Sequence, residues 1–382
     1  MRLSPDIDWI TQLLSTNFLA GNALTTYSHT LLNTVPFPLD PQPSWFPRLN
    51  ADLQSAQTVA QRWVDTDGPA VAAGLPQTWI DYGDLFIPTG RELSIRVAQI
   101  KQNPGRTPTE SERQALLGLL GQLSDRAQAQ RTTAADLQGR LRVFASQVEE
   151  QRGELSKDIK VAEATLTDDE AQVAQLRDQL AQLQARVSAI SEDAKNAFTN
   201  AATSGVTYSF TILGYSVEAA IAGAAFPVFG IAGGILALTF AAVQNALEDR
   251  ALLKDLQDIA NTQVMLTAEQ QQIASLRVII DTLIRLRDQN LQARQSGAGL
   301  VPTWEYIDGQ IQSVIEVLQQ PDVDISLISA LNTLEEAARD WQTIVTRATN
   351  VQNSSLTQTQ NVSLNSLIKP SAMQEGLSAR SL

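Results

Sequence analysis

The side chains that most often carry out catalysis or bind metal ions are scarce in this sequence. Its 382 residues contain one histidine, His29, and no cysteine, which excludes thiolate nucleophiles, thiolate metal sites and disulfides. The glycines of 230–234 stand among apolar residues without a following Lys-Ser/Thr, so they do not match a phosphate-binding loop. The acidic pairs at 168–169 and 335–336 fall on the solvated faces of predicted helices. We therefore predict that the protein is not an enzyme and that it uses no cofactor and no metal ion.

One acidic side chain, Glu218, stands in a long stretch that is otherwise free of charge. It is the single charged residue among the 41 residues from Gly205 to Asn245, where the chain-wide charged fraction of 18% predicts about seven. A segment with so few charges must leave water, either for a protein core or for lipid. We call residues 205–245 the head.

The head has two arms, because Phe226-Pro227 and the glycines that follow favour a turn. In the first arm, residues 206–212 alternate apolar and polar side chains, as a strand does. Read as a helix, the same arm carries one mildly polar face, at spacings of 3, 4, 4 and 3, formed by Ser204, Thr207, Thr211, Tyr215 and Glu218. Both conformations stay open. The second arm, residues 228–243, is apolar on all sides except at Thr239.

Two long, charged helical segments flank the head. There is no proline from Thr109 to Thr203, and apolar residues from Val173 to Ile190 step by 3 and 4, which is coiled-coil spacing. Thr109 and Glu112 have the form of a capping box, which predicts that a helix begins there. After the head, residues 252–286 carry the next amphipathic stripe.

Shorter helices are predicted in the remainder of the chain. Apolar periodicity predicts helices at 5–33, 49–64, 89–102, 304–319 and 327–345. Prolines and glycines predict breaks at 36–47, at 67–74 with an irregular region up to residue 89, and at 103–108. The last two helices are expected to form an antiparallel pair.

These elements predict an all-α fold. We expect an elongated antiparallel bundle of long helices, a coiled-coil rod, with the hydrophobic head at one end as a β-tongue or a helical hairpin. The predicted domains are the rod (1–204 and 246–350), the head (205–245) and a polar C-terminal tail (351–382) that is flexible or a thin strap on the bundle.

The charge balance restricts the partners. With 41 acidic and 28 basic residues the net charge is −13, which argues against nucleic acid and against an anionic membrane held through a basic patch. Contact with a membrane would therefore be hydrophobic. The first 20 residues contain Asp6 and Asp8 and lack an uninterrupted apolar run, so they do not match a secretory signal peptide. Release by lysis or by a dedicated route is expected.

This layout resembles the helical pore-forming toxins related to cytolysin A, which include the haemolysin BL and non-haemolytic enterotoxin components and the α-xenorhabdolysin-type cytotoxins. The resemblance covers Pro5 to Thr346, with Val173 to Ile190 as the ascending coiled coil, the head in the centre and Leu252 to Leu286 as the descending helix. It rests on layout, because the sequence contains no short fingerprint of the family.

The resemblance implies a function and a set of partners. It implies a secreted or released, soluble bundle that exposes its head at a target cell membrane, inserts it and joins further copies in a lytic, haemolytic pore. Many relatives act only with a second toxin component. The residues expected to enter the membrane are Val206, Phe210, Leu213, Val217, Phe226, Pro227, Val228, Phe229, Ile231, Ile235, Leu236, Leu238 and Phe240. Those expected to line the pore lumen are Thr207, Thr211, Tyr215 and Glu218.

A different class of function fits the same pattern. The chain could be a non-lytic coiled-coil scaffold or a membrane-tethered structural protein, with the head as a buried hairpin that caps the rod or as a permanent anchor. In the capped rod Glu218 would lie near the tip or form hydrogen bonds inside the head. Solubility without detergent and lysis of cells or liposomes distinguish these functions.

Overall fold

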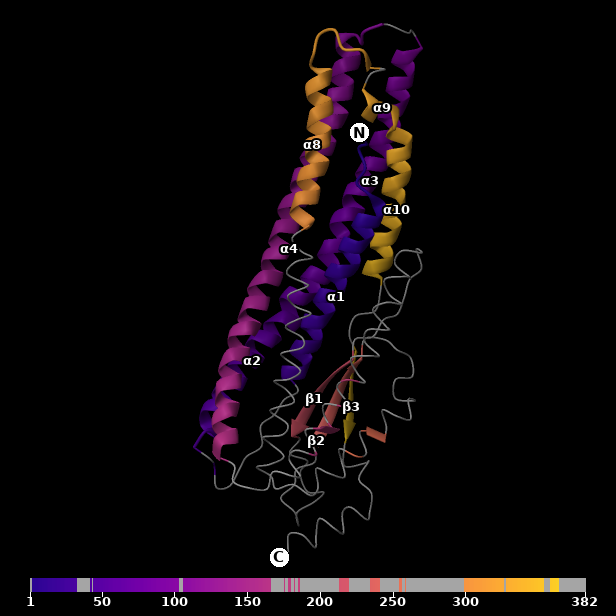
Figure 1. Cartoon of the computed structure of the whole chain (residues 1–382). Helices are drawn as coiled ribbons and strands as arrows, with labels where there is room; N and C mark the ends of the chain where they lie inside the picture. Colours follow the sequence, from indigo (N-terminus) through magenta and orange to yellow (C-terminus); the bar gives the residue numbers. More distant parts are fainter. Residues whose placement is uncertain are drawn as a thin grey trace, which may run out of the picture.

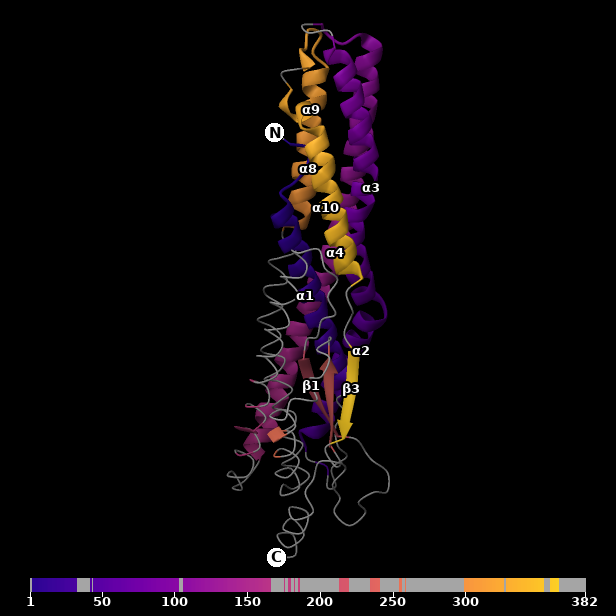
Figure 2. The ribbon, with the colours of Figure 1, turned by 90° about the vertical axis from the view of Figure 1, so that its right-hand side faces the viewer.

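The protein forms a rod of long helices with a small sheet at one end (Figure 1). The computed structural model describes residues 2–32, 42, 44–102, 106–165, 299–325 and 328–353, the strands 213–219, 234–240 and 358–363, and the isolated positions 175, 178, 179, 182, 185, 254, 255 and 258. The helices run along the rod in both views, and the strands lie beside its lower end (Figures 1 and 2). The predicted all-α, elongated bundle is confirmed for the rod.

The first two helices lie close to their predicted positions. α1 (Ile7–Leu32) buries Ile10, Leu14 and Phe18, one stripe at spacings of four, and α2 (Phe46–Arg62) buries Leu49 and Leu53 in the same way. Pro47 stands in the first turn of α2, where its missing N–H has no partner to lose. Most of the predicted proline-rich break between these helices lies outside the described residues.

The predicted break at 67–74 and the irregular region up to residue 89 are wrong. A π-helical turn, η1 (Trp63–Asp67), continues directly into α3 (Gly68–Lys101), a helix of 34 residues. Pro69 lies in its first turn, whereas Pro76 and Pro88 lie inside it. An interior proline costs a helix about 3 kcal/mol. The helix persists because it buries a continuous stripe of large side chains, among them Trp79, Tyr82, Phe86 and Leu93.

The capping box predicts the start of the longest described helix, and the structure confirms it. The backbone N–H of Glu112 donates to Thr109 Oγ1 at 3.3 Å, and the backbone N–H of Thr109 donates to Glu112 Oε2 at 2.8 Å. From there α4 (Glu110–Thr165) runs for 56 residues, about 84 Å at 1.5 Å per residue. Gly153 does not interrupt it. The rest of the helix predicted up to Thr203 lies outside the continuously described residues.

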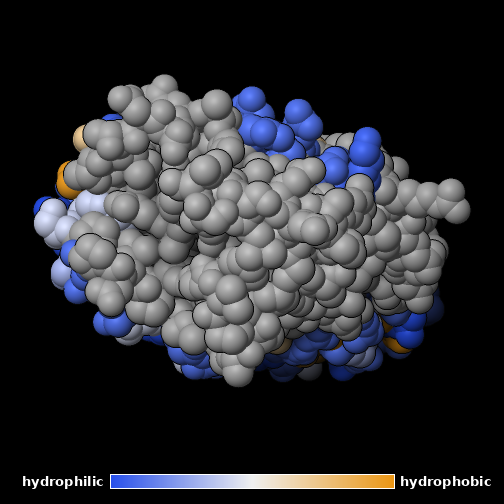
Figure 3. Space-filling model, turned by 90° about the horizontal axis from the view of Figure 1, so that it is seen from below, coloured by the Kyte–Doolittle hydropathy of each residue, from blue (hydrophilic) through white to orange (hydrophobic). Residues whose placement is uncertain are grey.

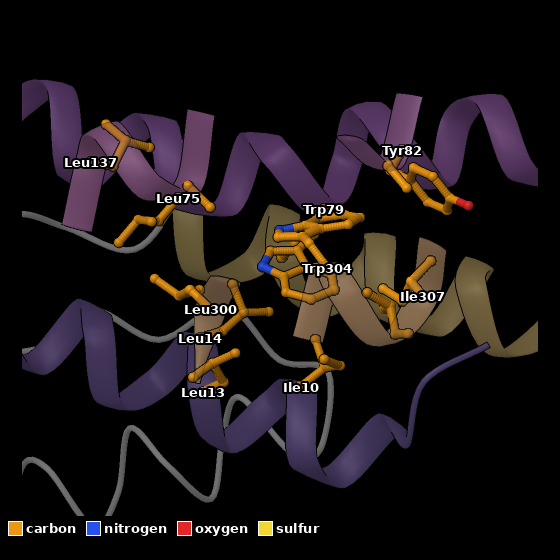
Figure 4. Close-up of a cluster of buried hydrophobic side chains, with 14 of the residues drawn as sticks. Ile10, Leu13, Leu14, Leu75, Trp79, Tyr82, Leu137, Leu300, Trp304 and Ile307 are labelled. Atoms are coloured by element: carbon orange, nitrogen blue, oxygen red, sulfur yellow. The ribbon is translucent and has the colours of Figure 1, made fainter. Parts of the chain in front are cut away.

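Two C-terminal helices complete the described rod. α8 (Leu300–Leu318) and α10 (Leu334–Gln352) occupy the two predicted segments, and the short α9 (Ser329–Asn332) precedes α10. α8 packs chiefly along α4 and α10 along α3. Aromatic rings connect α3 and α8 at the centre of the rod. Trp79 of α3 stacks on Trp304 of α8, with ring centroids 4.4 Å apart (Figure 4).

A three-stranded antiparallel sheet lies next to α1. The strands β1 (Leu213–Ala219) and β2 (Gly234–Phe240) belong to the head, and β3 (Gln358–Ser363) comes from the C-terminal tail. Their order is β1-β2-β3, and both β1 and β2 contact α1. Viewed from this end, most of the described surface that is visible is hydrophilic (Figure 3). The fold is thus a helical rod to which head and tail together add one small sheet.

Candidate membrane-insertion site

The strand register brings predicted insertion residues from the two arms of the head together. Leu213 is the partner of Phe240, and Val217 is the partner of Leu236. Residues directly opposite in an antiparallel pair have Cβ atoms about 4.5–5.5 Å apart. The two arms are therefore neighbours over seven residues each. Both the β-tongue and the helical hairpin require such neighbouring arms.

Alternation along the strands divides the sheet into two unlike faces. One face carries an almost wholly apolar set: Leu213, Tyr215 and Val217 of β1 with Leu236, Leu238 and Phe240 of β2. The opposite face carries small, polar or acidic residues together with one large apolar residue: Gly214, Ser216 and Glu218 of β1 with Ile235, Ala237 and Thr239 of β2. Most of the described insertion residues thus share one face.

The two described lumen candidates, Tyr215 and Glu218, lie on opposite faces of β1. The helical interpretation of the first arm places them on one face, because residues three apart are neighbours at 3.6 residues per turn. In a strand the period is two, so an odd spacing separates them. The polar face predicted from the helical pattern therefore does not exist in the strand conformation of β1.

The C-terminal tail covers one edge of the head hairpin. Strand β3 pairs with β2, with Leu236 opposite Val362 and Leu238 opposite Gln360. The six residues of β3 are thus part of a sheet with the head. They belong to the segment 351–382, which the sequence predicts to be flexible or a thin strap on the bundle. Sequence reasoning missed this strand because Gln358–Ser363 is polar throughout except for Val362 and has no apolar alternation.

Several predicted site residues lie outside the described residues. For the insertion set these are Val206, Phe210, Phe226, Pro227, Val228, Phe229 and Ile231, and for the lumen set Thr207 and Thr211. Both the strand pattern at 206–212 and the turn near 226–227 also fall there. The assignment of these residues stays a prediction.

The rod beside the head contains an apolar cavity between α1 and the start of α3. Its volume is about 180 Å³, and α1 contributes Phe18, Gly21 and Thr25 to its wall. A side chain at Gly21 would meet no atom within 4 Å, so the missing side chain is one cause of the cavity. His29 also lines it, and burial lowers the pKa of this imidazole, which favours the neutral form.

Two classes of site do not occur in the described part of the chain. Among the helices that the structure describes, none combines the length and the apolar character that a bilayer-spanning helix needs. Within the same residues, no group of three or more His, Cys, Asp or Glu side chains could hold a metal ion.

Comparisons with known proteins connect this geometry to one group of toxins. The model of the Bacillus haemolytic enterotoxin (HBL) family matches residues 10–190, from the first turn of α1 to the segment that precedes the head. The structure of the cytotoxin MakB from Vibrio cholerae is similar over 94% of this chain and 99% of that chain, with a TM-score of 0.71 at 16% identity. The resemblance to the helical pore-forming toxins is confirmed.

Two further structures of this kind are similar over almost their whole length. Soluble SmhA of the tripartite α-pore-forming toxin Smh from Serratia marcescens has a TM-score of 0.61 at 13% identity and covers 92% of this chain and 95% of that chain. The HblL1 toxin component from Bacillus cereus has a TM-score of 0.64 at 13% identity and covers 92% and 98%. None of the curated proteins compared matches the chain. The proteins that these comparisons name are toxins, in agreement with the prediction that this protein is not an enzyme.

Proposed function

We propose that the protein is a pore-forming cytotoxin and one component of a multi-part toxin. In this proposal it is released as a soluble monomer, exposes residues 205–245 at a target cell membrane, inserts them and joins further copies in a pore. The observation that carries the proposal is the position of the head. The two described strands of this 41-residue segment with one charge, β1 and β2, lie beside one end of the rod (Figure 1). The fold of the chain matches toxin structures along more than 90% of its length.

The two-faced hairpin supports the insertion step. One face of β1 and β2 carries Leu213, Val217, Leu236 and Phe240, which favour a hydrocarbon environment. A three-stranded open sheet has unpaired edges, and lipid has no donor or acceptor for them. The head must therefore change conformation on insertion, either to a helical hairpin or to strands that pair with those of neighbouring copies.

The pairing of β3 with β2 suggests an order of events. Because β3 begins six residues after the end of α10, its pairing with β2 limits how far β2 can move from the rod. We propose that separation of β3 from β2 precedes insertion. The backbone hydrogen bonds of the pair would then be replaced within the inserted head.

Release of dye from liposomes tests the proposal. The full chain, purified without detergent, is added to phosphatidylcholine vesicles loaded with a self-quenched dye, alone and together with the products of neighbouring genes. We expect release in at least one of these mixtures, and none from a variant that lacks residues 205–245 but retains the helical circular dichroism of the rod. A chain that never permeabilises vesicles or cells in any mixture would support the non-lytic scaffold instead.

A further inference from the structure

Three acidic side chains surround one arginine where α2 packs against the last third of α4. Arg48 Nε lies 2.9 Å from Asp158 Oδ1 and 3.9 Å from Asp52 Oδ2, and Arg48 Nη2 lies 3.4 Å from Glu154 Oε2. Lys157 Nζ lies 2.6 Å from the other oxygen of Glu154. Glu154 therefore has a second cation, whereas Asp52 and Asp158 share Arg48. The contact lies toward the end of the rod at which the strands are found (Figure 1).

The carboxyl groups of Asp52 and Asp158 lie within hydrogen-bonding reach of each other. The Asp158 side chain is only 4% exposed, and the Oδ2 atoms of both residues are buried with no hydrogen-bond donor among the described residues. Two ionised carboxylates are both acceptors, so they can form a hydrogen bond only when one of them carries a proton. Burial, the hydrogen bond to Asp52 and the charge of Asp52 raise the pKa of Asp158 to about 6.

A second buried aspartate near the same helices, Asp67, is surrounded by cations and not by another carboxyl group. Asp67, in η1, lies between Arg62 Nε of α2 at 3.2 Å and Arg140 Nη1 of α4 at 3.1 Å. It therefore has two cations and no acidic neighbour among these contacts. Asp67 is a matched control, because it links α2 and α4 through two arginines and without a second carboxyl group in these contacts.

The other charged groups near the pair do not cancel the electrostatic repulsion between the two ionised carboxylates. On α2 and α4 these groups are Arg48, Glu154 and Lys157, and Arg48 is 64% exposed, so solvent screens its charge. α1, which packs against α2, contributes His29 in its last turn, but this side chain lines the cavity toward α3. The lowered pKa of His29 also has the opposite effect on stability: protonation of the buried imidazole at acid pH destabilises the fold, whereas protonation of the aspartate pair stabilises it.

We propose that the Asp52–Asp158 pair is a proton-dependent contact that holds α2 against α4 at acid pH and weakens that contact at neutral pH. The proton lies between the two carboxyl groups when the contact is strong. When both are ionised, the second negative charge is buried beside the first, and α2 separates from α4 more readily. This proposal concerns the rod and does not depend on pore formation.

The direction of the pH dependence follows from linkage. An acid whose pKa is about 6 in the folded protein and 3.8 as a model value binds its proton more tightly when folded. Its contribution to stability is therefore complete below about pH 4 and is lost as the pH rises through about 6. Between pH 5.0 and pH 7.5 these two values correspond to about a tenfold change in the local opening equilibrium.

Hydrogen–deuterium exchange of the full chain at pH 5.0 and pH 7.5, corrected for intrinsic exchange rates, tests the proposal. We expect protection of peptides from α2 and from residues 148–165 to fall by about tenfold at pH 7.5. In Asp158→Asn the amide donates to Asp52 without a titrating proton, so protection should stay high at both pH values. Asp52→Asn is the second variant, with the same expectation should Asp158→Asn fail to fold.

Asp67→Asn is the control, and it should lose protection at both pH values while it keeps the difference between them. Peptides of α8 and α10 serve as an internal reference that should not respond. Equal protection of wild-type α2 at both pH values would overturn the proposal, as would a full pH response in both Asp158→Asn and Asp52→Asn.

Discussion

At the residue scale, Glu218 is the side chain whose role depends most on the conformation of the head. As a strand residue it is opposite Ile235, on the face that also carries Gly214 and Ser216. As a helix residue it would share a face with Thr211 and Tyr215. A carboxylate on the inner surface of a pore attracts cations, and one that faces lipid is strongly disfavoured.

We predict that Glu218 and Thr211 line the pore and that Glu218 makes it cation-selective. Reversal potentials in planar bilayers under a salt gradient should move toward zero in Glu218→Gln, because the ring of negative charge is removed. Ser216→Ala, which lies on the same face of β1, is the matched control and should leave selectivity unchanged. Unchanged selectivity of active Glu218→Gln pores would refute the lumen assignment.

A second residue-scale feature is the close approach of α3 and α10 at Gly83. A Cβ atom there would lie 2.2 Å from Val345 Cγ2, which is far inside van der Waals contact. We predict that Gly83→Ala lowers the free energy of unfolding by about 1–3 kcal/mol, measured by urea denaturation. The double variant Gly83→Ala/Val345→Ala should recover part of that loss. Gly118→Ala, where a Cβ meets nothing within 4 Å, should instead stabilise the protein by about 0.5–1 kcal/mol.

At the scale of elements, the pairing of β3 with β2 connects the last described segment of the chain to the head. The chain has no cysteine, so a single engineered pair forms a defined disulfide. Leu238 and Gln360 are direct partners, and opposite Cα atoms in antiparallel strands lie about 4.5–5.5 Å apart, a distance that a disulfide spans.

We predict that Leu238→Cys/Gln360→Cys loses most dye release when oxidised and recovers it when reduced, because β2 stays attached to the tail. Each single cysteine variant should release dye under both conditions. Oxidised protein that permeabilises vesicles as fast as reduced protein would show that insertion does not require β2 to leave β3.

Several elements could be predicted from the sequence because their signals are local. The apolar period of α1 and the reciprocal capping bonds of Thr109 and Glu112 depend on residues within a few turns. The continuity of α3 could not be predicted in this way, since Pro76 and Pro88 are outweighed by the burial of rings such as Trp79 against other helices. The polar β3 and the Asp52–Asp158 contact likewise depend on segments far apart in the sequence. For the candidate site, the sequence indicates which residues are apolar. It does not indicate whether they follow the period of 2 of a strand or the period of 3.6 of a helix.

At the scale of the whole molecule, the net charge of −13 opposes approach to an anionic bilayer. The proposed insertion is driven by apolar area and not by a basic patch. The lipid preference of the protein should therefore reflect long-range repulsion, which salt screens over about 10 Å at 0.1 M.

We predict that, at low ionic strength, vesicles with phosphatidylserine are permeabilised more slowly than vesicles of phosphatidylcholine alone. The difference should shrink as salt is raised toward 0.5 M, because the repulsion is screened. Leakage rates measured in a salt series for both compositions test this. Faster leakage of the anionic vesicles at low salt would contradict a purely hydrophobic contact.

The stacked indoles at the centre of the rod provide an intrinsic optical signal that reports movement of the helices of the rod and not of the head. All six tryptophans lie outside residues 205–245, and Trp79 and Trp304 are 4.4 Å apart at an interplanar angle of 24°. Rings this close couple electronically and give a characteristic band in circular dichroism. A head that refolds alone would leave this band intact, whereas separation of α8 from α3 would weaken it, because Trp79 would lose Trp304 and keep its contact with Trp341 of α10 at 6.3 Å. The order in which the two regions move can thus be timed in the unlabelled protein.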